Sequence, residues 1–304
     1  MREWSNDIKV YELEEGFTLE IADRKEYARY YAVYVQQEDN IGFKKDFQQS
    51  LDVVAEDDIC FWIKKDEKRI GGAFLRPNAI EGLFLIPPYN NSYKALILIK
   101  KALMCWSDRS KPIEANVVNE SQVEIYEKLG FRIVGRGRWM IRPTEEFIVE
   151  WEDKFEKVLP SKEQTNEIGK LLHAAYVDDP FQHYSLEEIT GFVEDYFENN
   201  SHIDILNKAS SAVYDKDTKE LIGVCLISEF NEWPLVYDIA VKKEYRGKGI
   251  AEKMLQNSLT ELKKDYPVVR LYVDSGNPAE TLYYNVGFFP GKKLTDLSIP
   301  ADNI

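Results

Sequence analysis

The stretch Val241-Lys-Lys-Glu-Tyr-Arg246-Gly247-Lys248-Gly249-Ile250-Ala251-Glu-Lys-Met-Leu255 decides the fold of the C-terminal half. It follows an apolar run, residues 235–241, that is typical of a buried strand, and it opens an amphipathic helix predicted from about Gly249 to Lys264. Small residues at 247, 249 and 251 allow a turn whose N–H groups face outward at the start of a helix, where the helix dipole favours an anion. The segment therefore predicts a site for a diphosphate. Positive charge nearby comes from Lys242, Lys243 and Lys248.

Two common phosphate-binding loops are excluded at this turn. A Walker A loop needs Lys and then Ser or Thr after its last glycine, whereas Gly249 is followed by Ile250. The dinucleotide fingerprint needs a third glycine, and Glu252 stands there. The pattern present is Arg-x-x-Gly-x-Ala. Two glycines alone also fit a plain strand-to-helix turn without a ligand. The diphosphate site is therefore predicted from the order of elements around the turn, which is more specific.

The C-terminal half is predicted to alternate strands and helices. Ser161-Lys-Glu-Gln164 and Ser185-Leu-Glu-Glu188 each have the spacing of a capping box that opens a helix. The further expected elements are strands 211–214, 221–230, 235–241 and 268–273, a helix over 249–264, a short helix over 278–285 and a last strand from 288. This order predicts an α/β fold, with a mixed sheet and helices on both faces.

The two halves of the chain share local patterns. Tyr126-x-x-x-Gly130-Phe131 is repeated as Tyr283-x-x-x-Gly287-Phe288, 157 positions later. A repeat at this distance indicates a duplicated domain rather than a solenoid. The expected seam is the charged stretch from Glu145 to Glu156, which gives domains over 1–150 and 151–304.

Composition narrows the function. The chain has 304 residues and a formal net charge of −14, which makes a nucleic-acid-binding face a poor interpretation and weakly favours cationic substrates. The three cysteines are scattered, and His173, His183 and His202 are too dispersed for a metal motif, so neither a disulfide framework nor a metal site is expected. No secretory signal and no membrane-spanning stretch is visible. A cytoplasmic protein without a membrane partner is expected.

The sequence resembles the GCN5-related N-acetyltransferases. The motif [Arg/Gln]-x-x-Gly-x-[Gly/Ala] that follows the fourth strand of that family is matched by Arg246, Gly249 and Ala251. The later segment Asn277-Pro-Ala-Glu-Thr-Leu-Tyr283-Tyr-Asn-Val-Gly287-Phe288 is similar to the family's Asn-x-x-Ala…Leu-Tyr-x-x-x-Gly-Phe, with a slightly short spacing. The strong likeness covers about residues 221–290 and a weaker one about 55–135. The resemblance implies two tandem acetyltransferase-like domains.

The resemblance also implies roles for individual residues. The backbone of Ile239, Ala240 and Val241 would bind the pantetheine arm of acetyl-CoA, and Asn277 would contact the same arm. The diphosphate would be held by Arg246, Gly247, Lys248, Gly249, Ile250 and Ala251. Tyr283 would place its hydroxyl at the thioester sulfur, with neighbouring Tyr284 as the competitor.

The base that accepts the amine proton is left open between three carboxylates. Family members often carry a Glu early in the fourth strand, but the equivalent position here is near Leu235. Glu229, Glu232 and Asp238 are the candidates, and Glu232 is preferred because it precedes the strand. Strand alternation places Asp238 on the face opposite Ile239 unless a bulge intervenes.

Other side chains have a functional and a structural interpretation. The resemblance implies that the region of the aromatic residues Tyr176, Phe181 and Tyr184 lines the acceptor site, and core packing is the alternative. Cys225, in the middle of a strand, is interpreted as a buried structural thiol rather than a nucleophile.

The N-terminal half departs from the family pattern. Pro87-Pro88-Tyr-Asn-Asn-Ser92-Tyr-Lys94-Ala-Leu96 stands opposite residues 242–251, so the glycines are replaced and two residues lack an N–H group. This half is expected not to bind acetyl-CoA in the usual way. The resulting hypothesis is a metal-free N-acetyltransferase that moves an acetyl group from acetyl-CoA to an amine acceptor, a small molecule or a peptide, by direct attack. The alternative is a non-catalytic acyl-CoA-binding or regulatory module. The oligomeric state is left open.

Overall fold

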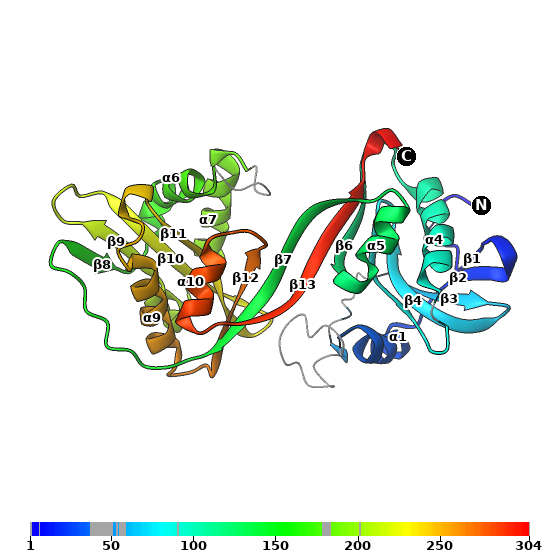
Figure 1. The fold of residues 1–304 in the computed structure, drawn as a ribbon, viewed down its shortest axis with the longest axis horizontal. Helices are drawn as coiled ribbons and strands as arrows, with labels where there is room; N and C mark the ends of the chain where they lie inside the picture. The colour runs from blue at the N-terminus through cyan, green and yellow to red at the C-terminus, as the bar shows by residue number, and fades with distance from the viewer. Residues whose placement is uncertain are drawn as a thin grey trace. The chain divides into compact units, whose positions relative to one another are not determined.

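The computed structural model describes residues 2–5, 7–36, 51–52, 54, 59–89, 91–177, 184–200 and 202–303. It divides into two compact units, residues 1–138 with 291–304, and residues 139–290. Each unit combines a mixed sheet with helices, so the expected α/β fold is confirmed (Figure 1). The division differs from the expected 1–150 and 151–304, because the boundary after Arg138 lies inside a strand and the chain end belongs to the first unit.

The first unit contains a meander followed by strand and helix pairs. Its elements are β1 (Val10–Glu12), η1 (Glu14–Gly16), β2 (Phe17–Ile21), α1 (Arg24–Tyr31), the π-helical turn η2 (Ala32–Gln36), β3 (Cys60–Lys65), β4 (Lys68–Arg76), β5 (Ala79–Leu85), α4 (Ser92–Trp106), β6 (Ile113–Asn119), α5 (Glu120–Lys128), the first part of β7 (Arg132–Pro143), most of β13 (Phe289–Ile299) and η5 (Ala301–Asn303).

The final strand explains why the chain end belongs to the first unit. The strand order there is β1-β2-β3-β4-β5-β6-β13, with β5 and β6 parallel and the other pairs antiparallel. β13 pairs with β6 from Leu294–Asn119 to Ile299–Ile113. Leu297 and Ile299 are thereby buried in the core of the first unit, among side chains of α4 and β6.

The second unit carries the segment that opened the sequence analysis. Its elements are the last part of β7, β8 (Phe155–Val158), η3 (Lys162–Gln164), α6 (Thr165–Tyr176), α7 (Leu186–Asn200), α8 (Asp204–Ala209), β9 (Ser211–Asp215), β10 (Leu221–Phe230), β11 (Trp233–Val241), η4 (Lys243–Tyr245), α9 (Ile250–Leu262), β12 (Val268–Asp274), α10 (Ala279–Val286) and the start of β13. These elements agree with the expected order, except that β7, β8, α8 and the short turn η4 were not predicted.

Helices cover both faces of the second unit's sheet, whose strand order is β12-β11-β10-β9-β8 (Figure 1). On one face, Val224, Leu226 and Ala240 pack with α6 and α7. On the other face, side chains of β10 and β11 such as Cys225 and Val241 pack with α8, α9 and α10. Neighbouring residues of β10 thus contribute to two separate apolar clusters, as the alternation of a strand requires.

Local capping explains where the helices begin. The Ser185 N–H donates to Glu188 Oε2 at 2.7 Å, while the Glu188 N–H donates to Ser185 Oγ at 3.2 Å, so the expected capping box opens α7. At the start of η3, the Ser161 N–H donates to Gln164 Oε1 at 2.8 Å, and α6 continues from that turn.

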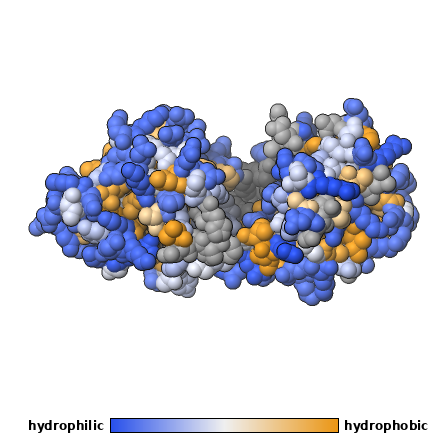
Figure 2. Space-filling model, turned by 90° about the horizontal axis from the view of Figure 1, so that it is seen from above, coloured by the Kyte–Doolittle hydropathy of each residue, from blue (hydrophilic) through white to orange (hydrophobic). Residues whose placement is uncertain are grey.

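The face of the molecule seen in Figure 2 is mostly polar where it is coloured. Hydrophilic residues cover most of the face seen in Figure 2, and apolar residues form separate groups on it. Within the described ranges, no helix is both long and apolar enough to cross a membrane.

Candidate active site

The glycine turn between β11 and α9 is exposed. Gly247 has φ +77° and Gly249, the N-cap residue of α9, has φ +73°, conformations that glycine adopts without strain. A Cβ atom built on either glycine would meet no atom within 4 Å. The backbone of the turn is therefore open to a ligand and not covered by side chains.

The amide groups of this turn have no internal acceptor. The first hydrogen bond of α9 runs from the Lys253 N–H to the Gly249 carbonyl oxygen at 3.0 Å. Among the described residues, the N–H groups from Gly247 to Glu252 donate to no acceptor. This run of amides lies at the positive end of the helix dipole and can hold an anion such as a diphosphate.

The positively charged side chains near the turn differ in whether they have a partner within the chain. Arg246 donates from Nε to the Val241 carbonyl oxygen at 3.1 Å and so holds the end of β11 against the turn. Lys242 pairs with Glu220 at 2.7 Å, which raises the pKa of Lys242. Lys248 is exposed and makes no ion pair within the described part of the chain. Lys248 is therefore the lysine of these two that stays available to an anion.

Strand β11 contains a bulge. In its antiparallel register with β10, Ile227 pairs with Val236 and Leu226 pairs with Asp238, so Tyr237 is an extra residue. A bulge of this kind re-aims side chains and increases the local twist. Tyr237 contacts Tyr196 of α7, with ring centroids 5.6 Å apart, and both Tyr237 and Asp238 thus lie on the face that α6 and α7 cover.

Beyond the bulge, the backbone of β11 turns polar groups toward β12. The Lys242 N–H donates to the Ile222 carbonyl oxygen at 2.8 Å, so in the alternating antiparallel ladder Ala240 also bonds to β10. The C=O and N–H groups of Ile239 and Val241 consequently point the other way. The parallel register of β11 with β12 comprises one pair in the described residues, Leu235 with Arg270, near the start of β11. These backbone groups are thus placed where an extended ligand could add to the strand edge.

Tyr283 of α10 lies in the core beside the strand edge. Its side chain is 6% exposed, whereas that of Tyr284 is 66% exposed, so only Tyr283 faces the interior of the second unit. Burial raises the pKa of Tyr283, and the nearby Cys225 and Asp238 raise this pKa further. Within the described residues, its hydroxyl has no hydrogen-bond partner. It therefore keeps its proton at neutral pH and can donate it.

Asp238 is a carboxylate of β11 itself, next to Ile239 in the strand. It is half-buried, and burial raises the pKa of its carboxyl to about 7, while a hydrogen bond with the Ile239 N–H opposes the shift. The Tyr176 hydroxyl, at the end of α6, donates a hydrogen bond to Asp238 Oδ1. No local sequence pattern predicts this contact, because the two residues are 62 positions apart.

Glu232 occupies a different place. Asn231 and Glu232 form the two-residue turn between β10 and β11, with φ of +49° and +62° and Phe230 paired with Trp233. Glu232 is exposed at the tip of this hairpin. Four residues of strand lie between Glu232 and Tyr237, and the two Cα atoms are about 17 Å apart along an extended strand. This placement does not suit the role of base that the sequence analysis preferred for Glu232.

Two further predicted positions have local structural tasks. Asn277 accepts a hydrogen bond at Oδ1 from the Ala279 N–H at 2.9 Å and thereby caps α10, which leaves its Nδ2 for a ligand. Cys225 is buried, and burial raises the pKa of its thiol to about 12. A thiol with this pKa is a poor nucleophile at neutral pH, in agreement with the structural role expected for it.

The aromatic trio expected near the acceptor is described in part. Phe181 lies outside the described residues, as does His183. Tyr184 packs edge-on against Phe192 of α7, with ring centroids 5.1 Å apart. Across the described ranges, no three His, Cys, Asp or Glu side chains lie close enough together to hold a metal ion.

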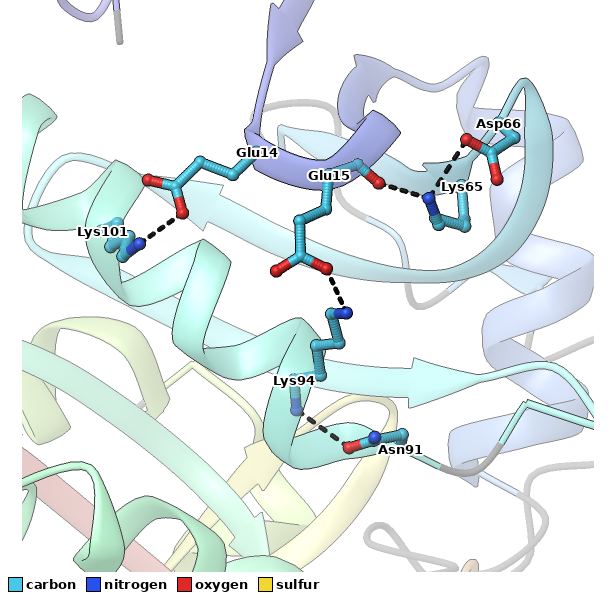
Figure 3. Close-up of polar contacts among 7 residues, drawn as sticks. All are labelled: Glu14, Glu15, Lys65, Asp66, Asn91, Lys94 and Lys101. Carbon is cyan, nitrogen blue, oxygen red and sulfur yellow. Dashed lines mark hydrogen bonds and ion pairs between the residues drawn. The ribbon is translucent and has the colours of Figure 1, made fainter.

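The corresponding helix of the first unit begins differently (Figure 3). Ser92 is the first residue of α4, and the Asn91 side chain accepts a hydrogen bond from the Lys94 N–H at 3.0 Å. One of the amides at this helix start is thus already occupied. Pro87 and Pro88, which precede the helix, have no N–H group to offer.

An acidic turn neutralises lysines of α4. As Figure 3 shows, Glu15 of η1 reaches Lys94 and Glu14 reaches Lys101, the latter pair at 2.5 Å. The hydrogen bond from Lys94 lowers the pKa of Glu15. The first unit therefore presents paired charges where the second unit presents open amides and an unpaired lysine.

Comparison with known proteins agrees with this geometry. Residues 180–293 match the family model of the acetyltransferase (GNAT) domain. This span contains β11, the glycine turn, α9 and α10, so the resemblance to the GCN5-related N-acetyltransferases is confirmed there. No curated protein gives a significant match to the chain.

Solved structures extend the likeness in fold to both units. A GCN5-related N-acetyltransferase from Sphaerobacter thermophilus has a TM-score of 0.67 at 14% identity, over 95% of this chain and 97% of that chain. A tandem GNAT protein from the clavulanic acid biosynthesis pathway has a TM-score of 0.56 at 12% identity, over 95% of this chain and 99% of that chain. An acetyltransferase of the GNAT family from Colwellia psychrerythraea also has a TM-score of 0.56 at 12% identity, over 92% of this chain and 98% of that chain. At these identities the likeness shows the fold alone.

Proposed function

We propose that the second unit transfers an acetyl group from acetyl-CoA to an amine. The observation that supports this most is the glycine turn, with its run of amides from Gly247 to Glu252 that have no acceptor among the described residues. The GNAT domain match spans the same turn and supports an acetyltransferase.

The coenzyme would bind along β11 and the start of α9. Its diphosphate would accept hydrogen bonds from the amides of residues 247–251, with Lys248 adding charge. Its pantetheine arm would add to the edge of β11 at the Ile239 carbonyl oxygen and the Val241 N–H, which point away from β10. Asn277 Nδ2 would contact the same arm. Arg246 supports this arrangement through its hydrogen bond to the Val241 carbonyl oxygen.

The reaction would proceed by direct attack. The amine nitrogen bonds to the thioester carbon, and the carbon–sulfur bond then breaks. A backbone N–H of β11 would stabilise the negative charge on the carbonyl oxygen. Tyr283, which keeps its proton because burial raises its pKa, would donate that proton to the leaving thiolate.

A substitution in the turn tests the coenzyme site. Gly249→Val places a branched side chain at φ +73°, which costs roughly 1–2 kcal/mol of backbone strain and covers the amides. We expect isothermal titration to show acetyl-CoA binding to the wild type and an affinity at least about 10-fold lower in the variant. Gly130→Val in the first unit is the matched control, because Gly130 has φ +87° and is equally strained by a side chain.

The outcomes separate the candidate functions. Release of coenzyme A in the presence of amines supports the transferase. Tight binding of acetyl-CoA with no thiol release from a broad amine panel favours the non-catalytic acyl-CoA-binding module. Equal binding by the wild type and the Gly249→Val protein contradicts the proposed coenzyme site.

A further inference from the structure

Asp238 lies on the opposite face of the sheet from Tyr283. It pairs with Leu226, whose side chain packs with α6 and α7, whereas Tyr283 packs with α9 and its neighbours. Burial, and to a lesser extent the charge of Asp238, raises the pKa of Tyr283. A carboxylate on one face and a phenol on the other therefore flank the strand edge where the thioester would lie.

Asp238 has no cationic partner within the described residues. The groups that face it are the Tyr176 hydroxyl from α6 and the Ile239 N–H of its own strand. Neither of these carries a positive charge at neutral pH. Half-burying a carboxylate without a cationic partner costs free energy, and an ammonium group of a ligand would supply that partner.

Aromatic side chains extend from Asp238 along the same face. Tyr237, next to Asp238, donates a hydrogen bond to the Phe192 carbonyl oxygen at 3.3 Å, and the Phe192 ring contacts Tyr184. Tyr184, Phe192 and Tyr237 are 48%, 40% and 38% exposed, so each offers part of its ring to solvent. We call these three residues the aromatic row.

The charge near the aromatic row is negative. A second carboxylate, Asp195, stands on α7, the helix that carries Phe192. Burial and then the charge of Asp195 raise the pKa of Tyr237. The C-terminal half, residues 151–304, has 17 basic and 27 acidic residues. A cation is attracted both by these carboxylates and by the faces of the rings.

We infer that Asp238 and the aromatic row form the acceptor site, and that its substrate is a primary amine attached to an aromatic or apolar body. Asp238 binds the ammonium group and then accepts one proton from its nitrogen. The freed lone pair attacks the thioester carbon, the carbon–sulfur bond breaks, and the thiolate takes the proton of Tyr283. The second proton of the attacking nitrogen restores the Tyr283 hydroxyl through water, and Asp238 releases its proton to water. Tyr176 is a positioning residue, because its hydrogen bond orients the carboxylate. This inference rests on the proposed acetyl transfer.

The test compares two amines on the full chain. With acetyl-CoA as donor, we expect kcat/KM for 2-phenylethylamine to exceed that for D-glucosamine by at least about 10-fold, because only the former has an apolar body for the aromatic row. Asp238→Asn should lower kcat by about 100-fold or more, the usual contribution of a general base. Because the pKa of Asp238 is about 7, the activity of the wild type should fall as the pH drops below about 7. This acid-side fall should be absent from the pH profile of the Asp238→Asn variant.

Tyr176→Phe separates positioning from a purely structural role. Removal of a hydrogen bond to the charged carboxylate favours its protonated form, so the acid side of the pH profile should move to higher pH. Asp217→Asn, in an exposed turn, is the control and should leave rate and profile unchanged. Acetyl-CoA titration of each variant shows that the coenzyme site and the fold are intact.

Failure of this inference differs from failure of the proposed function. If the wild type transfers acetyl groups to both amines equally and Asp238→Asn keeps rate and profile, the acceptor site is wrong while the acetyltransferase stands. If the wild type binds acetyl-CoA but acetylates neither amine, while it acetylates another amine without an apolar body, the substrate class is wrong. If it does not bind acetyl-CoA, both proposals are overturned.

Discussion

Asn91 accepts a hydrogen bond from the backbone N–H of Lys94 at 3.0 Å, so the first helix turn of α4 is capped from within. In the second unit, Gly249 stands at the N-cap and has no side chain that could do the same for α9. The two helices follow comparable strands, yet among the described residues the side chain of the N-cap residue occupies an amide only in α4.

This difference predicts one coenzyme site per chain. Isothermal titration should give one acetyl-CoA per chain, because the first unit offers prolines, a side-chain cap and lysines that are already paired with Glu14 and Glu15. Gly249→Val should therefore remove all of the high-affinity acetyl-CoA binding, and not half of it. Two equivalent sites in the titration would contradict the assignment of the first unit.

Tyr283→Phe should slow acetyl transfer by about 100-fold, because the thiolate then leaves without a proton donor. The affinity for acetyl-CoA should change little, since the ring and its packing remain. Tyr284→Phe is the matched control, as Tyr284 is exposed. Steady-state rates of thiol release measure both variants. Comparable rates in the two would show that Tyr283 is a core residue only.

Asp238 makes stability depend on pH. Its pKa is raised from 3.8 to about 7 in the folded protein, so the folded state binds more protons than the unfolded state between these values. Its contribution to the free energy of unfolding is fully present below the unfolded pKa and is lost as the pH rises through about 7.

The matching measurement is thermal unfolding of the wild type and Asp238→Asn from about pH 5 to 8. The melting temperature of the wild type relative to the variant should fall as the pH rises over this range. A constant difference between the two proteins would show that the pKa of Asp238 is not raised in the folded state.

The cysteines predict a distinct labelling pattern. Cys60 and Cys225 are buried and Cys105 is exposed. A thiol reagent such as dithionitrobenzoate should therefore modify one cysteine rapidly in the native protein and all three after unfolding. Cys225→Ala should keep acetyl transfer within about 3-fold, because direct attack needs no enzyme thiol. Loss of transfer in a folded Cys225→Ala protein would favour a covalent intermediate.

The sequence by itself determined the strand, glycine turn and helix around Gly249. Their signals are local: an apolar run, residues that tolerate positive φ, and a helical stripe, which together leave few alternatives for the backbone. The exposed amides follow directly, because nothing else in this short segment can accept their hydrogen bonds. The GNAT fold was expected on a different ground, the resemblance of the motif at Arg246, Gly249 and Ala251 to that family.

Only the tertiary structure decided which carboxylate lies beside the strand edge and where the chain divides into two units. The bulge at Tyr237 depends on the hydrogen-bond register with β10, and no residue type in β11 specifies that register. Tyr176 reaches Asp238 because α6 packs on that face, a contact between residues far apart in sequence. The last strand joins the first unit because Leu297 and Ile299 are buried there, and local pattern does not reveal which core an apolar strand will enter.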